Sequence, residues 1–166
     1  MLTSIMLLDG CSQSVQYAGD GRLIDNGVTA PDTRYVVEAG TVDLSRAGST
    51  TFRMSGLPRT YFVIGLEVPV GADGAATKAG TTPADVSLQV YQEDHGTAAL
   101  VTTPLRDWTW SRGARQGSAF VYLPQSPRSY FDAFTEARYR LTVTVNVPDP
   151  SIPAGSLVVL KSAGWK

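Results

Sequence analysis

The stretch from Tyr139 to Val147 constrains the possible folds of this chain most strongly. It reads Tyr-Arg-Leu-Thr-Val-Thr-Val-Asn-Val, so that apolar and polar residues alternate strictly and most of the apolar ones are β-branched. A period of two residues is typical of a strand with one face in a hydrophobic core and the other in solvent. We therefore expect this stretch to be the penultimate strand of a two-sheet sandwich.

Other short segments with β-strand composition follow one another along the chain, separated by turn signals roughly every 8–14 residues. The 16 glycines and 10 prolines favour many turns over long helices. The predicted fold class is all-β, an antiparallel two-sheet β-sandwich of Greek-key or jelly-roll type. It would have about nine or ten strands and at most one short helix. Among the expected strands are Thr60–Val68, Val86–Gln92, Arg106–Trp110 and Ser156–Ser162.

Two local expectations accompany this fold. Gly65 lies inside the strongly apolar segment Thr60–Val68, and a glycine within a strand indicates a bulge or a close approach of another group to the backbone. The one helical turn is expected over Ser129–Ala137, where Tyr130, Phe131 and Phe134 would dock on the core.

Charge and composition exclude several classes of function. The formal net charge is −1, so no bulk field attracts nucleic acid or anionic lipid. The chain has one cysteine and one histidine, which excludes an intramolecular disulfide and a multi-thiolate or multi-histidine metal centre within one chain. We expect no cofactor and no metal.

The N-terminus has a pattern of its own, in which Leu8, Gly10 and Cys11 follow a short apolar run. This pattern resembles the end of a bacterial lipoprotein signal peptide, although Asp9 stands where a small uncharged residue is usual. The resemblance implies that Cys11 becomes the mature N-terminus and carries lipid, because two acyl chains or more give stable anchoring. The protein would then be lipid-anchored in the bacterial envelope, at the periplasmic face of the outer membrane. The alternative is a frayed terminus with an idle thiol.

The resemblance divides the chain into a signal remnant and tether over residues 1–18 and a single β-sandwich domain over residues 19–166. A second resemblance concerns the lead-in to the alternating stretch. Ala137 and Tyr139 match the tyrosine corner of immunoglobulin-like and fibronectin-like sandwiches, in which the tyrosine hydroxyl bonds the backbone a few residues upstream. Leu141 stands where immunoglobulins have a cysteine, so the chain is not an antibody-type domain.

The candidate binding residues lie in the segment Arg106–Arg115. On a strand, Trp108 and Trp110 would share one face with Arg106 and Arg112, and Arg115 follows. Indoles beside guanidinium groups suit an anchor at a protein interface, or stacking on the sugar rings of a glycan. The alternative is that the two tryptophans belong to the core and the arginines lie at its rim.

The sequence contains no clear set of catalytic residues. His95 lies in Glu93-Asp94-His95-Gly96, a composition typical of a hairpin turn, and no Gly-x-Ser-x-Gly motif accompanies it. We therefore expect a non-catalytic binding or structural module that docks an envelope protein partner and contacts the membrane through its N-terminal lipid alone. A carbohydrate-binding module that uses Trp108 and Trp110 is the alternative, and a hydrolase that uses His95 is a remote one.

Overall fold

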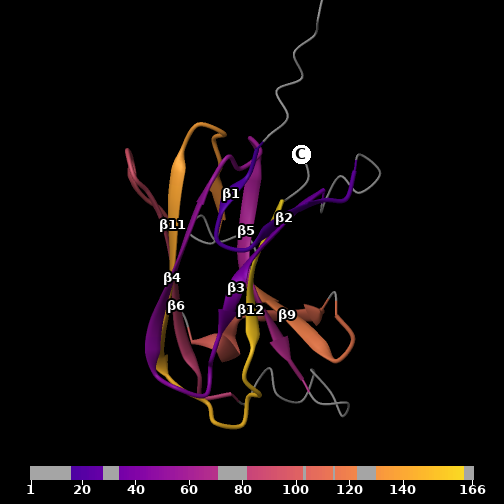
Figure 1. Ribbon diagram of the computed structural model, residues 1–166. Coiled ribbons are helices and arrows are strands. Elements are labelled where there is room, and N and C mark those ends of the chain that lie inside the picture. Colours follow the sequence, from indigo (N-terminus) through magenta and orange to yellow (C-terminus); the bar gives the residue numbers. More distant parts are fainter. Residues whose placement is uncertain are drawn as a thin grey trace, which may run out of the picture.

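A computed structural model of the chain describes residues 16–27, 34–70, 82–102, 104–113, 115–122 and 130–162. These residues form twelve strands in two antiparallel sheets that pack face to face (Figure 1). The all-β sandwich predicted from the sequence is confirmed. Helical structure in the described part of the chain is limited to one 3-10 turn, Leu105–Asp107.

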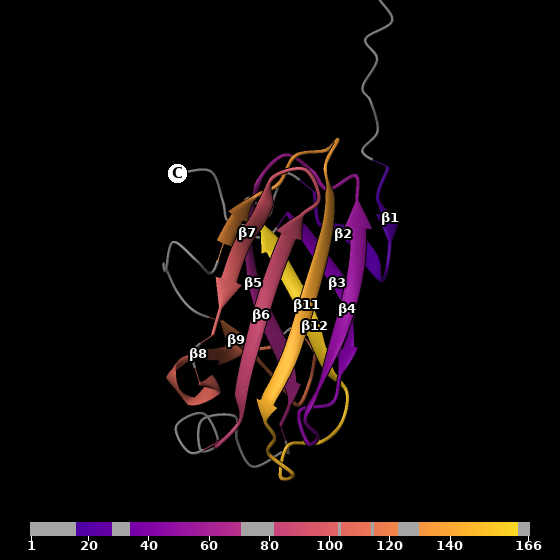
Figure 2. The same ribbon diagram turned by 90° about the vertical axis from the view of Figure 1, so that its left-hand side faces the viewer.

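The first sheet has five strands in the order β1-β4-β11-β6-β7 and is seen face-on in Figure 2. Their bounds are Ala18–Gly19 for β1, Gly48–Ser55 for β4, Arg138–Val147 for β11, Asp85–Gln92 for β6 and Gly96–Val101 for β7. The alternating stretch is therefore β11, the central and penultimate strand. Its apolar residues Tyr139, Leu141, Val143 and Val145 are buried, as the period of two predicts.

The second sheet has seven strands, in the order β2-β3-β12-β5-β9-β8 with β10 also paired to β5. Their bounds are Arg22–Asp25 for β2, Tyr35–Val42 for β3, Ser156–Ser162 for β12, Tyr61–Pro69 for β5, Ser118–Tyr122 for β9, Thr109–Arg112 for β8 and Tyr130–Asp132 for β10. One edge of β5 thus carries two partners, β10 beside its first residues and β9 beside its last. The core lies between the two sheets.

The N-terminal segment joins one edge of each sheet. Strand β1 pairs with the end of β4, and after a short turn β2 pairs with β3 in the other sheet. Asp20 fixes the turn, since its backbone N–H donates to the Arg53 carbonyl at 2.8 Å and its carboxylate accepts the Arg53 N–H at 2.7 Å. Ala18 pairs with Ser55, so the first described strand of the sandwich begins at this residue. Cys11 and the signal-like segment lie outside the described residues.

The contact expected of the tyrosine corner is present. Tyr139 is 1% exposed, and its hydroxyl accepts a hydrogen bond from the backbone N–H of Phe134 at 2.8 Å. Its ring centroid lies 5.3 Å from that of Phe131. Burial raises the pKa of the Tyr139 hydroxyl, although the bond from Phe134 acts in the opposite direction. The hydroxyl therefore stays protonated and joins β11 to the loop before it.

The helical turn expected over Ser129–Ala137 is not found in the part of this segment that the structure describes. Residues 130–132 form strand β10, in which buried Phe131 alternates with exposed Tyr130 and Asp132. The ring of Phe131 points inward and stacks on Phe62 of β5, with centroids 6.0 Å apart. The prediction was wrong because three neighbouring aromatic residues fit a helical spacing, whereas only every second residue of β10 reaches the core.

Candidate functional site

The predicted strand Arg106–Trp110 is broken. Pro104 precedes a 3-10 turn over Leu105–Asp107, and the strand β8 begins only at Thr109. Leu105 and Trp108, three residues apart, are both buried, because a 3-10 turn brings residues i and i+3 to the same side. Sequence alternation alone could not show that Trp108 and Trp110 belong to different elements.

The tryptophans belong to the core. Trp108 is 4% exposed, and Trp110 is partly buried and packs against the same cluster of core residues. The core interpretation is therefore confirmed for Trp108. Neither a sugar ring nor a partner side chain could stack on the Trp108 indole in this structure.

Two arginines of the same segment, Arg106 and Arg115, have different partners. Arg106 is exposed and forms a long ion pair with Asp107, whose closest atoms are 3.9 Å apart. Arg112 lies in β8 opposite Ala119 in register, and its side chain is outside the described part of the structure. Arg115 turns toward Glu67. Of the predicted binding residues, Trp108 and Trp110 pack on one core cluster, Arg106 pairs with Asp107, and Arg115 lies in a defined polar network.

His95 is exposed in the β6–β7 turn, as its sequence context predicts. Its backbone N–H donates to the Gln92 carbonyl at 3.1 Å, a turn contact. The structure therefore offers no observation in favour of a hydrolase that uses this histidine.

A set of interacting side chains lies on the outer face of the seven-stranded sheet. Gly65 of β5 leaves room for the ring of Phe120, because a Cβ at Gly65 would stand 2.6 Å from two atoms of that ring. Tyr122 stacks on Phe120 with centroids 5.2 Å apart and an interplanar angle of 21°. The Nζ atom of Lys161 lies 3.7 Å from the Phe120 centroid, within the range of a cation–π interaction. The close approach predicted at Gly65 is confirmed.

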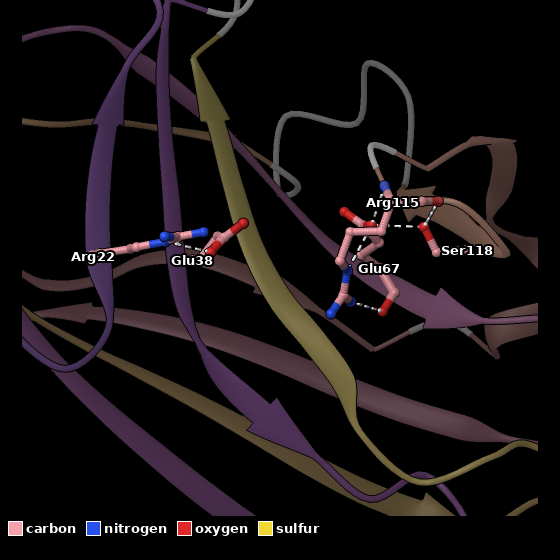
Figure 3. Close-up of polar contacts among 5 residues, drawn as sticks. All are labelled: Arg22, Glu38, Glu67, Arg115 and Ser118. Atoms are coloured by element: carbon pink, nitrogen blue, oxygen red, sulfur yellow. Dashed lines mark hydrogen bonds and ion pairs between the residues drawn. The ribbon is translucent and has the colours of Figure 1, made fainter.

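Beside this stack, a buried carboxylate collects three donors (Figure 3). Glu67 is 2% exposed, and its Oε1 accepts the backbone N–H and the Nε–H of Arg115, both at 2.9 Å. The Ser118 hydroxyl lies 2.6 Å from the same oxygen and 2.6 Å from the Arg115 carbonyl, so its one proton serves either acceptor. Because Arg115 lies in the β8–β9 connection and Glu67 in β5, the network fixes that connection against the sheet.

The protonation of the two charged groups follows from this geometry. Burial raises the pKa of Glu67, but the hydrogen bonds from Ser118 and Arg115 outweigh it, and the pKa lies below its ordinary value. Burial lowers the pKa of Lys161, and the negative charge of Glu67 partly offsets this shift. Glu67 is therefore an ionised structural group at neutral pH. It is not a poised acid or base.

Two tyrosines extend the same outer face toward the start of β5. Tyr61 is 45% exposed and Tyr130 is 38% exposed, although their neighbours Phe62 and Phe131 are buried. Their rings form an edge-to-face pair with centroids 6.0 Å apart and an interplanar angle of 79°. In register, Tyr130 lies opposite Val63, which in turn lies opposite Lys161. We call the surface formed by Tyr61, Tyr122, Tyr130 and Lys161 the aromatic face. The Phe120 ring is 5% exposed and lies buried against Tyr122 and Lys161.

Comparison with known proteins does not assign a family. Neither family models, nor curated proteins, nor solved structures give a match to this chain. The described residues contain no group of three or more His, Cys, Asp or Glu side chains placed to hold a metal ion. None of the helical structure in the described segments has the length and hydropathy of a membrane span.

The aromatic face was not predicted as a site, because its residues come from four strands that only strand pairing brings together. One signal was available at Glu67, which is an acidic residue inside an otherwise apolar strand. A carboxylate in such a position needs a hydrogen-bonding partner, since burying it alone is costly. Its partner Arg115 is 48 positions away, and only the pairing of β5 with β9 brings the two together.

Proposed function

We propose that this protein is a non-catalytic β-sandwich module of the bacterial cell envelope, which is held at the membrane by lipid on Cys11 and docks a protein partner. The aromatic face is the docking surface. The observation that supports this assignment most directly is the exposed edge-to-face pair of Tyr61 and Tyr130. Tyrosine is enriched at protein interfaces, because it offers a large apolar surface with a polar tip and few rotatable bonds.

The neighbouring groups also suit a docking surface. The Phe120–Tyr122 stack and the Glu67–Arg115–Ser118 network hold this part of the sheet in one arrangement. A surface that is ordered before binding loses little conformational entropy when a partner docks. Lys161 adds a cationic group at the centre, so that a partner with a carboxylate opposite it gains specificity as well as contact area.

The lipid anchor is tested by the mass of the mature protein. Purification of the full chain from the membrane fraction is expected to yield a polypeptide that begins at an acylated Cys11. The Cys11→Ser variant is expected to keep its leader and to lack the added mass of the acyl chains. An unmodified Met1 at the start of the mature wild-type protein would count against the anchor.

The docking surface is tested by crosslinking in cells that produce the full chain. A photoreactive phenylalanine derivative in place of Tyr130 is expected to give one discrete protein adduct, and the additional change Tyr61→Ala is expected to weaken it at least severalfold. The matched control carries the same derivative at Thr51, an exposed position on the outer face of the five-stranded sheet. Equal adducts from both faces, or an adduct that does not depend on Tyr61, would refute the assignment of the face.

A further inference from the structure

The outer face of the five-stranded sheet differs from the aromatic face, because three exposed arginines gather on it. Arg53 lies near the end of β4, and Arg138 and Arg140 lie at the start of β11, the strand beside it. Tyr91 of β6 completes this group, since the guanidinium carbon of Arg140 stands 4.9 Å from the centroid of its ring. We call Arg53, Arg138, Arg140 and Tyr91 the arginine face. It lies in the upper part of the sheet in Figure 2, at the end where β4 finishes and β11 begins.

These arginines lack the carboxylate partners that most other arginines have. The ion pairs found among the described side chains involve Arg22, Arg34, Arg46, Arg106 and Arg115. None of them involves an arginine of the arginine face. Among the described residues, these three guanidinium groups therefore form no ion pair, although the carboxylate of Asp20 binds the Arg53 backbone N–H and Glu93 lies nearby.

The pairing of the strands makes this arrangement unfavourable for folding. Arg53 and Arg140 are direct partners in the β4–β11 ladder, and like charges opposite each other destabilise a sheet. The contact of Arg140 with Tyr91 relieves part of this repulsion, because it draws the guanidinium toward β6. The remaining cost would be removed by an external anion that binds both arginines.

A shallow hollow of about 300 Å³ lies beside two of the three arginines, at the end of the sheet. Arg53 and Arg138 contribute to its lining, with Gly19 and Ser55 beside them. Glu93 also contributes, and its single negative charge offsets only part of the positive charge. A group of this size that carries an oxyanion would accept hydrogen bonds from both guanidinium groups, whose fork geometry matches phosphate.

The rest of this outer face carries hydroxyl groups where the aromatic face carries rings. Ser49 faces Thr144, and Thr51 faces Thr142, with 3.2 Å between the hydroxyl oxygens of each pair. Such a surface is polar. It suits the hydrated, phosphate-bearing surface of a bilayer better than the apolar centre of a protein interface.

Only a short piece of chain separates this face from Cys11. Ala18 and Gly19 of β1 line the hollow, and Ala18 is seven residues after Cys11. Seven extended residues span at most about 25 Å. A lipid on Cys11, which belongs to the proposed function, would therefore hold the hollow within reach of the headgroups.

We propose that the arginine face binds the phosphate headgroups of an anionic membrane. The sandwich would then rest on the bilayer with its five-stranded sheet and direct the aromatic face away from it. The position near the membrane depends on the lipid anchor of the proposed function, whereas the charge of the face does not. For this reason the test uses the full chain with Cys11→Ser, which carries no lipid.

The experiment measures cosedimentation of this chain with vesicles at low ionic strength. Vesicles of phosphatidylglycerol and phosphatidylcholine are expected to bind it, and vesicles of phosphatidylcholine alone are not. Each arginine near an anionic surface contributes about 1 kcal/mol, or about fivefold in affinity, so the triple variant R53Q/R138Q/R140Q is expected to bind about a hundredfold more weakly. Added salt is expected to weaken the binding of the parent chain.

The matched control is the triple variant R22Q/R46Q/R106Q, which loses the same charge from exposed positions elsewhere. It is expected to bind the anionic vesicles much better than the first triple variant does. Thermal unfolding of both variants shows whether each of them folds. Equal losses in the two variants, or no binding to anionic vesicles, would overturn the proposal. Tighter binding to poly-glutamate than to vesicles would also overturn it in favour of an acidic protein. These outcomes are independent of the proposed function. That function is tested separately, by the mass of the mature N-terminus at Cys11 and by crosslinking from Tyr130.

Discussion

Replacing Tyr139 with alanine is expected to lower the free energy of unfolding by about 4 kcal/mol, as the loss of a buried aromatic ring typically does. The ring is almost fully buried between the sheets and packs on Phe131. Its removal leaves a cavity beside β11, the strand that joins β4 to β6. Denaturant unfolding followed by tryptophan fluorescence measures the loss, since Trp108 lies in the same core.

The companion variant Tyr139→Phe separates the hydrogen bond from the packing. It keeps the ring and leaves the N–H of Phe134 without the acceptor that it has at 2.8 Å. The expected cost is about 1 kcal/mol. If Tyr139→Phe were as destabilising as Tyr139→Ala, the corner would depend on its hydroxyl, and the packing argument would fail.

Gly65→Ala is expected to lower the free energy of unfolding by about 3 kcal/mol, because the added methyl group overpacks the sheet. The new Cβ would stand 2.6 Å from the Phe120 ring and 2.6 Å from the backbone carbonyl oxygen of Val121. The ring could turn aside, whereas the carbonyl is held in the β5–β9 ladder. Displacing Phe120 also disturbs its contacts with Tyr122 and Lys161, so binding at the aromatic face should weaken in the same variant.

Gly48→Ala is the matched control, because Gly48 is also a strand glycine but has open space where the Cβ would be. Its expected effect on the free energy of unfolding is within about 0.5 kcal/mol. Thermal or denaturant unfolding of the two variants side by side measures the difference. Equal stabilities would show that Phe120 and β9 yield easily to the added methyl group.

The features that the sequence predicted correctly are those that one strand carries by itself. The alternation in Tyr139–Val147 reflects the burial of every second residue of β11, and Gly65 marks a close approach to its own strand. The tyrosine corner is also local, since Tyr139 and Phe134 are five residues apart. Such features can be predicted without knowing which strands pair with each other.

The predictions that failed, and the sites that were missed, depend on how strands pair. Trp108 looked like part of a strand, but a 3-10 turn follows Pro104 and carries the indole into the core. The aromatic face exists because β9 and β10 both pair with β5. The arginine face likewise exists because β4 and β11 place Arg53 opposite Arg140. Composition cannot show these pairings.

The pairing of the N-terminal segment with both sheets has a mechanical consequence. A pulling force on this segment first reaches β1, which is held to β4 along only two residues. Antiparallel bonds at a sheet edge open one after another under such a load, and Asp20 must then release Arg53 before the force reaches β2. Under tension, β1 and the Asp20 turn would therefore detach first and lengthen the free N-terminal segment by a few residues, while β3 to β12 stay folded.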